Sequence, residues 1–203
     1  MNPRSFREYD IRGVAERDLD DTTVHALGIA IGKRAAGGTV VVGRDPRVHS
    51  PRLFSALTDG LRVHADVTDI GVVPTPVLYF AAHHLEPAAA VMITGSHNPP
   101  EDNGFKILRG TEALHGPDIA ALRDEVAEIL KHALPPPPRA LHSRDVSAAY
   151  LDRAAGELQL GQRRCKVVVD AGNGADLIAK VKEEGAEVGI ALDGDADRLG
   201  AVD

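Results

Sequence analysis

Apolar and polar positions follow two different periods along most of the chain. Short apolar runs bounded by glycine or polar residues predict buried strands, and segments with apolar residues at helical spacing predict amphipathic helices. The strands predicted in this way cover residues 39–43, 67–71 and 88–94, and the helices cover residues 24–34, 50–61, 77–84 and 118–134. Because the two kinds of element alternate through short connections, we predict an α/β fold with mixed, largely parallel sheets flanked by helices.

A run of four prolines, Pro135 to Pro138, interrupts this pattern. Such a run is stiff and extended, which is typical of a spacer between domains and less often of a ligand for an SH3-type domain. We therefore predict a first domain over residues 1–138 and a partial second domain over residues 139–203. Within the second domain, the pattern predicts a helix over residues 146–158 and strands over residues 166–170 and 190–192.

Composition and charge argue against several classes of protein. The 203 residues are 43% hydrophobic, which is enough for a globular core, and no apolar run reaches the length of a membrane span. A formal net charge of −7 and an aromatic content of 3% argue against nucleic-acid binding, because that function needs a basic face and stacking side chains. Cys165 is the single cysteine, so no internal disulfide can form and a reducing cytoplasm fits. We expect a soluble cytoplasmic protein with neither nucleic-acid nor membrane partners.

The first candidate site lies in residues 94–107, TGSHNPPEDNGFKI, directly after a predicted strand. A glycine and a proline pair prevent this loop from continuing as strand or helix, so a hydroxyl, an imidazole and an amide stand side by side on stiff backbone. These groups belong to Ser96, His97 and Asn98. Neighbouring serine and histidine residues most often form only a polar turn. Lys106 favours a site instead, because it can bring a cation back towards Ser96.

The second candidate site is DGDADR, residues 193–198, which follows the last predicted strand. It contains three carboxylates at alternate positions, the acidic triad of Asp193, Asp195 and Asp197. These groups would repel one another without a cation, and all-oxygen ligands favour a hard ion such as Mg²⁺. A calcium loop of the EF-hand kind does not fit, because Arg198 stands where that loop requires glycine. A solvated acidic turn remains the alternative.

Together, TGSHNPPEDNGFKI and DGDADR resemble the active-site serine loop and the metal-binding loop of the α-D-phosphohexomutases, in particular of the phosphomannomutase/phosphoglucomutase type. Two further segments are similar to motifs of that family: FREYDIRG at residues 6–13 and the arginine-containing loop GRDPRVHS at residues 43–50. On its pattern alone, the segment over residues 6–14 predicts an edge strand with charged residues. The resemblance covers nearly the whole chain.

The resemblance implies a role for each of these segments. Ser96 would carry a phosphoryl group, with His97 or Lys106 as the general base, and the acidic triad together with Ser96 would hold Mg²⁺. Arg198 would contact the phosphoryl group or position the acidic loop. The other positions implied in binding the substrate or its phosphate are Tyr9, Arg12, Arg44, Arg47 and Asn98.

The implied activity interconverts hexose 1-phosphate and hexose 6-phosphate, of mannose or glucose, through a phosphoserine and a bisphosphorylated sugar. Small-molecule hexose phosphates would be the partners, glucose 1,6-bisphosphate or its mannose equivalent the activator, and the protein a monomer or a weak homo-oligomer. A phosphoglucosamine mutase is the near alternative, and a truncated, catalytically incomplete Mg²⁺-binding fragment is another. A phosphatase-type hydrolase with Asp193 as its nucleophile is a third, although it leaves the serine loop with no task.

The resemblance breaks in the second predicted domain. Residues 170–175, DAGNGA, are similar to the strand and glycine turn that open this domain in the family, but the helix, strand and loop that follow there are missing before Asp176. The chain also ends at Asp203, where family members continue into further domains. We therefore expect the family's first domain and an abbreviated second one. If the polypeptide itself is shortened, we expect it to be too incomplete for turnover.

Overall fold

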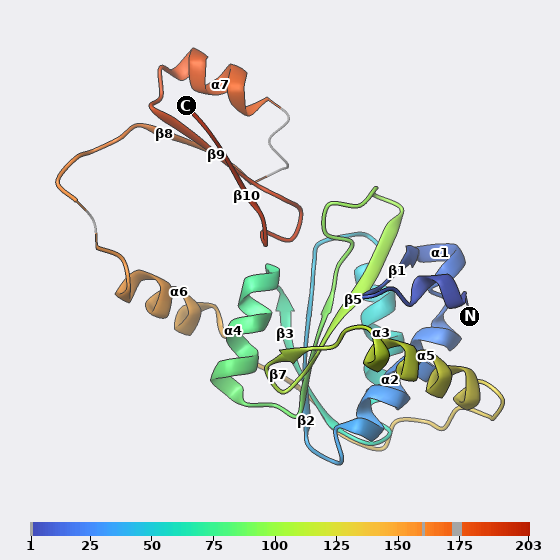
Figure 1. Ribbon diagram of the computed structural model, residues 1–203. Helices are drawn as coiled ribbons and strands as arrows, with labels where there is room; N and C mark the ends of the chain where they lie inside the picture. The colour runs from blue at the N-terminus through green and yellow to red at the C-terminus, as the bar shows by residue number, and fades with distance from the viewer. Residues whose placement is uncertain (1, 160, 172–175) are drawn as a thin grey trace.

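The computed structural model describes residues 2–159, 161–171 and 176–203, which fold around two β-sheets (Figure 1). The strands of the larger sheet are β1 (Ile11–Val14), β2 (Thr39–Arg44), β3 (Asp66–Val72), β4 (Ala89–Ile93), β5 (Asp102–Arg109), β6 (Glu112–Ala113) and β7 (Leu141–Ser143). The smaller sheet contains β8 (Val167–Asp170), β9 (Val188–Leu192) and β10 (Leu199–Val202). In the described residues the strand orders are β1-β5-β4-β2-β3-β7, with β6 beside β5, and β10-β9-β8.

The centre of the larger sheet is parallel. β2 runs parallel to both β3 and β4, and β3 runs parallel to β7, whereas β5 is antiparallel to its neighbours β4 and β1. The carboxyl ends of β2, β3 and β4 consequently lie at one edge, and the loops that follow these strands meet there. In open α/β sheets this edge is where ligands bind.

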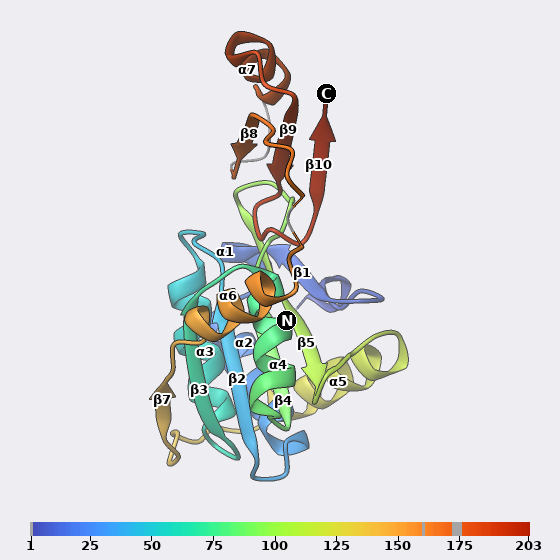
Figure 2. The same cartoon turned by 90° about the vertical axis from the view of Figure 1, so that its left-hand side faces the viewer.

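Helices cover both faces of the larger sheet (Figures 1 and 2). One face carries α2 (Asp21–Arg34), α3 (Ser50–Leu61) and α5 (Pro117–Ile129), and the other carries α4 (Thr75–Leu85) and α6 (Ser147–Gly156). Each face has its own cluster of buried apolar side chains. The predicted α/β fold with mixed sheets flanked by helices is therefore confirmed. None of the described helices is both long and apolar enough to cross a membrane.

Several elements differ from their predicted form. β5 was not predicted, because Asn103 and Gly104 interrupt its apolar pattern; a Cβ at Gly104 would lie 2.3 Å from the Ile11 carbonyl oxygen, so glycine is needed where β5 meets β1. Only residues 11–14 of the predicted N-terminal edge strand form a named strand, preceded by the 3₁₀ helix η1 (Pro3–Ser5) and followed by the short helix α1 (Ala15–Asp18). β7 lies beyond the boundary expected at residue 138, yet it pairs with β3 of the larger sheet.

The smaller sheet carries α7 (Leu177–Glu184) on one face, where Leu177 and Val181 pack over Gly189. Its strand β8 includes most of the strand predicted over residues 166–170, whereas the glycine turn of the DAGNGA motif at residues 172–175 lies outside the described residues. The connection between β9 and β10 contains the acidic triad. Figure 1 shows this connection directed at the end of the larger sheet.

Candidate active site

Ser96 lies in the loop after β4 and is almost completely buried, with 2% of its surface exposed. Its backbone is left-handed, with φ of 50°, a conformation that costs free energy for a residue other than glycine and persists only where the surroundings enforce it. The N–H of Ser96 donates to Thr94 Oγ1 at 2.8 Å. Its Oγ lies 3.2 Å from His97 Nδ1 and 3.3 Å from Asp193 Oδ2 of the other sheet. The serine hydroxyl thus faces both an imidazole and a carboxylate.

The half-buried Arg47 holds the backbone of this serine loop. Its Nη2 donates to the carbonyl oxygens of Ser96 at 2.8 Å and Asn98 at 2.7 Å. Its Nη1 donates to the carbonyl oxygens of Pro99 at 2.6 Å and Asp102 at 3.0 Å. Four carbonyl groups therefore converge on one guanidinium, which directs its donors to the loop and not to a bound phosphate.

A buried carboxylate, that of Asp45, binds both the serine loop and Arg47. Its Oδ2 accepts from the Gly95 N–H at 3.1 Å and pairs with Arg47 Nε at 3.3 Å, while its Oδ1 accepts from Ser50 Oγ at 2.5 Å. Ser50 is the first residue of α3, so this bond ties the start of that helix to Asp45. The sequence interpretation overlooked Asp45, although it lies in the GRDPRVHS segment between the two arginines singled out there.

Arg12 on β1 also contacts the serine loop. Its Nη1 donates to Asn98 Oδ1 at 2.6 Å, and its Nη2 pairs with Asp10 at 2.6 Å. The Asn98 amide in turn donates to Asp102 at 2.8 Å. Tyr9 is mostly exposed and lines the cavity beside Arg12. Arg12, Asn98 and Tyr9 thus lie at the predicted site, with the first two bound to each other.

The acidic triad forms a compact group of oxygen atoms. One carboxylate oxygen from each of Asp193, Asp195 and Asp197 lies within 4.8 Å of the others. Asp193 Oδ1 closes the loop by accepting from the N–H groups of Asp197 at 3.1 Å and Arg198 at 3.2 Å. Asp195 Oδ1 is buried with no hydrogen-bond partner among the described residues. A buried carboxylate oxygen without a partner is costly, so these donors fit a hard divalent cation.

Lys106 on β5 binds the acidic loop. Its Nζ lies 3.1 Å from Asp195 Oδ2 and also contacts Asp197 Oδ2. Burial opposes the charge of Lys106, but its hydrogen bond to Asp197 and the charge of Asp195 raise its pKa above the ordinary value. Burial opposes the charge of Asp195 too, yet hydrogen bonding from Thr75 and the Lys106 cation lower the pKa of that carboxyl. Lys106 therefore carries its proton in this arrangement.

Two cavities share Ser96, His97 and Arg198 among their lining residues. One, of about 510 Å³, extends along the acidic loop and the start of β10. The other, of about 420 Å³, is lined by the cations Arg7, Arg12, Lys106 and Arg198, and by Tyr9 and Tyr79. Asp10 also lines this cavity and pairs with Arg12, but Arg7 and Arg198 add further positive charge, which suits an anionic ligand even though the whole chain is negatively charged. Arg7 and Tyr79 were not among the predicted site residues.

Arg44 is absent from the residues that line either of these cavities. Its Nη1 pairs with Asp69 at 2.8 Å, and its guanidinium stacks over the Phe54 ring at 4.3 Å. The two arginines of the GRDPRVHS segment therefore differ in their surroundings, since Arg47 binds the serine loop and Arg44 packs between β3 and α3.

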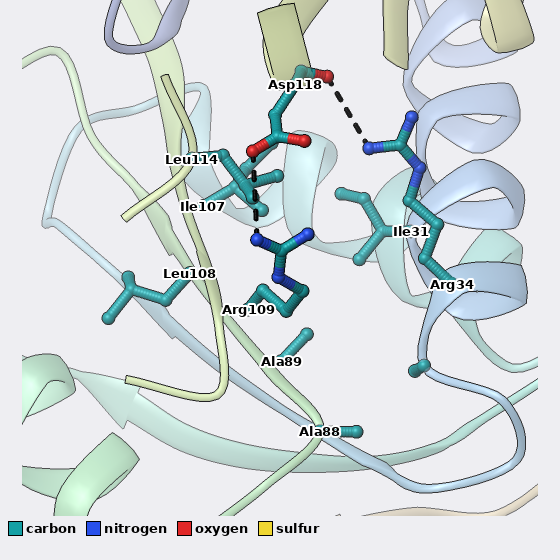
Figure 3. A pocket seen from close by; sticks show the side chains of 10 residues that line it. Ile31, Arg34, Ala88, Ala89, Ile107, Leu108, Arg109, Leu114 and Asp118 are labelled. Carbon is teal, nitrogen blue, oxygen red and sulfur yellow. Dashed lines mark hydrogen bonds and ion pairs between the residues drawn. The ribbon is translucent and has the colours of Figure 1, made fainter. Parts of the chain in front are cut away.

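A third cavity, of about 340 Å³, lies between α2, α5 and the end of β5 (Figure 3). Its wall is mainly apolar, with Ile31, Ile107 and Leu114 among the lining residues. The charged groups at its edge contact one another: Arg34 donates to the Asp118 carbonyl oxygen at 3.5 Å, and Arg109 lies 3.9 Å from the Asp118 carboxylate. This cavity is remote from the serine loop.

Replacing Arg47 by lysine should loosen the serine loop without unfolding the protein. An ammonium group cannot reach four carbonyl oxygens in the geometry of the guanidinium fork, and each buried acceptor left unpaired costs about 1–3 kcal/mol. We expect hydrogen exchange over residues 95–99 to become at least roughly tenfold faster, since about 1.4 kcal/mol corresponds to a factor of ten. Arg44→Lys is the matched control and should leave this exchange unchanged; equal effects from the two variants would contradict the assignment.

Comparison with known proteins defines the class to which this fold and site belong. Residues 3–133 match the family model described as phosphoglucomutase/phosphomannomutase, alpha/beta/alpha domain I, and the chain belongs to this family. This confirms the resemblance seen in the sequence. The chain is 38% identical to the phosphomannomutase/phosphoglucomutase of Pseudomonas aeruginosa, over 97% of this chain and 51% of that protein. It is 34% identical to the phosphoglucomutase of Neisseria gonorrhoeae, over 97% of this chain and 52% of that protein.

Solved structures have the same fold. A phosphoglucomutase/phosphomannomutase family protein from Burkholderia thailandensis superposes with a TM-score of 0.88 at 34% identity, covering all of this chain and 55% of that one. A putative phosphomannomutase from Thermus thermophilus gives a TM-score of 0.79 at 26% identity, covering 97% and 56%. The chain therefore spans about half the length of its relatives. The Pseudomonas alignment extends over 242 positions, against 203 residues here, so that relative has residues in the aligned half without a counterpart in this chain.

Proposed function

We propose that the chain provides the phosphoserine and the metal-binding loop of a phosphohexomutase, which interconverts hexose 1-phosphate and hexose 6-phosphate of mannose or glucose. One observation carries this proposal. The Ser96 hydroxyl, buried after β4, lies 3.3 Å from a carboxylate of the acidic triad, which a different sheet supplies. The names of the relatives, phosphomannomutase/phosphoglucomutase and phosphoglucomutase, support the choice of substrate.

In the proposed reaction Ser96 exchanges a phosphoryl group with the sugar. The bond between Ser96 Oγ and phosphorus breaks as a hydroxyl oxygen of the hexose phosphate forms its own bond to phosphorus, which gives a bisphosphorylated sugar. The proton of that hydroxyl passes through His97 to Ser96 Oγ, which leaves as a neutral hydroxyl. The sugar then turns round and returns its other phosphoryl group to Ser96. Glucose 1,6-bisphosphate, or its mannose equivalent, would load the serine at the start. Transfers of this kind depend mainly on positioning and electrostatic stabilisation.

The surrounding side chains have separate tasks in this proposal. His97 Nδ1, 3.2 Å from Ser96 Oγ, accepts the proton that the serine hydroxyl loses when it takes a phosphoryl group. Lys106 pairs with Asp195 and Asp197 and donates to phosphoryl oxygens in this proposal, whereas His97, which contacts Ser96 Oγ, is the base. The phosphoserine carries roughly −1.5 to −2 charges at neutral pH, which the cations of the second cavity offset.

The acidic triad, together with the phosphorylated Ser96, would hold Mg²⁺. When bound, the ion offsets negative charge on the transferring oxygens. We further propose that residues 1–138 form the first domain and residues 139–203 part of a second. Residues 139–203 also contact the first domain. Strand β7 pairs with β3, and the Tyr150 ring on α6 lies 5.6 Å from the Phe80 ring on α4.

Turnover by the protein as its gene encodes it tests the proposal. It should be assayed with mannose 1-phosphate, glucose 1-phosphate and glucosamine 6-phosphate, each with Mg²⁺ and glucose 1,6-bisphosphate. Isomerisation of the mannose and glucose phosphates supports the proposal, whereas a preference for the glucosamine phosphate indicates a phosphoglucosamine mutase. Release of inorganic phosphate without isomerisation would contradict a mutase. Absence of turnover, with Ser96 still accepting a phosphoryl group, would indicate a catalytically incomplete fragment.

A further inference from the structure

The connection between β3 and α4 contacts the acidic loop of the smaller sheet. Thr75, the first residue of α4, is completely buried at 0% exposure. Its N–H donates to the Asp195 carbonyl oxygen at 2.8 Å, and its hydroxyl donates to Asp195 Oδ2 at 2.7 Å. The two residues are 120 positions apart in the sequence. The sequence of residues 73–76, Val-Pro-Thr-Pro, does not predict this contact.

The two bonds from Thr75 fix both the main chain and the side chain of Asp195. Because Oδ2 accepts from Thr75 and Lys106, the rotation of the carboxylate is set. The other oxygen, Oδ1, stays buried and without a hydrogen-bond partner among the described residues. Groups that hydrogen-bond to a metal-binding carboxylate in this way orient it and tune its affinity.

The main-chain bond from Thr75 differs in kind from the other contacts between the acidic loop and the larger sheet, because it does not involve a carboxylate oxygen or the Ser96 hydroxyl. Lys106 binds carboxylate oxygens of Asp195 and Asp197, which are the atoms that a divalent cation would also attract. The contact from Ser96 to Asp193 involves a hydroxyl that has a chemical task in the proposed reaction. The bond from the Thr75 N–H to a carbonyl oxygen competes with neither, so it can persist with or without a cation.

We propose that Thr75 is a positioning residue that orients Asp195 and fastens the acidic loop to the sheet that carries Ser96. Its hydroxyl sets the carboxylate for cation binding, and the hydroxyl and the N–H together hold the loop. The carboxylates that would bind the cation and the Ser96 hydroxyl then lie in one site, although the two groups follow strands of different sheets. The close approach of the two loops fits this role, since a Cβ at Gly194 would lie 2.9 Å from the Ser96 carbonyl oxygen. The inference rests on the proposed function for its metal-binding part.

The test compares two variants of Thr75 with a control. Thr75→Val removes the hydroxyl at nearly constant volume, and Thr75→Ser retains it. Thr58→Val removes another buried hydroxyl, which donates to the Phe54 carbonyl oxygen within α3, remote from the site. Mn²⁺ affinity, measured by electron paramagnetic resonance, should fall about 10–100-fold in Thr75→Val and stay near the wild-type value in Thr75→Ser and Thr58→Val. If Thr75→Val does not fold, Thr75→Ala takes its place with the same expected results.

A second measurement needs no metal. Without added cation, hydrogen exchange over residues 193–198 should accelerate in Thr75→Val and remain unchanged in Thr75→Ser and Thr58→Val. Unchanged Mn²⁺ affinity and unchanged exchange in Thr75→Val would overturn the inference. If the wild-type protein binds no Mn²⁺, the proposed metal site and the metal-binding part of this inference are wrong, and the exchange measurement alone decides whether Thr75 holds the loop.

Discussion

Replacing Ser96 by alanine should abolish phosphorylation of the protein and lower turnover by at least about 10³-fold, as is usual when a nucleophile is removed. The variant has no hydroxyl to accept a phosphoryl group, and the structure offers no other hydroxyl at the position 3.2 Å from His97 Nδ1 among the described residues. Phosphoryl incorporation from radiolabelled glucose 1,6-bisphosphate, together with steady-state turnover, measures the effect.

The left-handed backbone of Ser96 provides a sharper comparison. At φ of 50°, glycine is favoured over alanine by roughly 1–2 kcal/mol, so Ser96→Gly should be the more stable variant in thermal unfolding. Both variants lack the hydroxyl, and both should be equally inactive. Ser143→Ala, on exposed β7, is the control for loss of a serine hydroxyl elsewhere. Substantial turnover in either Ser96 variant would exclude Ser96 as the phosphoryl carrier.

Replacing Lys106 by methionine should lower turnover by about 10²–10³-fold, the usual effect of removing a donor that stabilises charge in a transition state. The same substitution should leave Mn²⁺ affinity unchanged or make it tighter. The reason is that the Lys106 ammonium occupies carboxylate oxygens of Asp195 and Asp197, and its removal frees them for the cation.

Turnover and Mn²⁺ affinity together distinguish two roles of Lys106, electrostatic stabilisation of the transferring phosphoryl group and attachment of the acidic loop to β5. Lys106→Arg keeps the positive charge and should restore part of the turnover if electrostatic stabilisation is the task. If Lys106→Met weakens Mn²⁺ binding and leaves turnover intact, Lys106 only ties the acidic loop to β5. Steady-state kinetics and electron paramagnetic resonance on the same preparations give both readings.

Local patterns predicted the elements whose sequence obeys one period. The apolar run of β2 and the helical spacing of α2 lie where the sequence placed them, and the Asp20 side chain caps α2 by accepting from the Thr23 N–H at 2.9 Å. β5 was not predicted because Gly104, which allows β1 to approach closely, resembles a turn residue in the sequence. α5 ends at Ile129, short of the predicted residue 134, since its apolar pattern continues into the turn beyond the helix.

The candidate site shows the same division between local and non-local information. The serine loop and the acidic triad are contiguous in sequence, so their chemistry could be read before their contact was known. Arg44 and Arg47 looked equivalent in the sequence, but only the folded chain shows that Arg47 lies under the carbonyl groups of the serine loop. The contact of Thr75 with Asp195 crosses 120 positions, and a lone threonine between two prolines carries no signal of it.

The most direct test of the central claim is to locate the phosphoryl group. The protein as its gene encodes it should be incubated with Mg²⁺ and glucose 1,6-bisphosphate, and its intact mass and tryptic phosphopeptides measured by mass spectrometry. We predict a gain of one phosphoryl group, on Ser96. No gain in mass, or a phosphoryl group on Asp193 in place of Ser96, would contradict the proposed mutase mechanism.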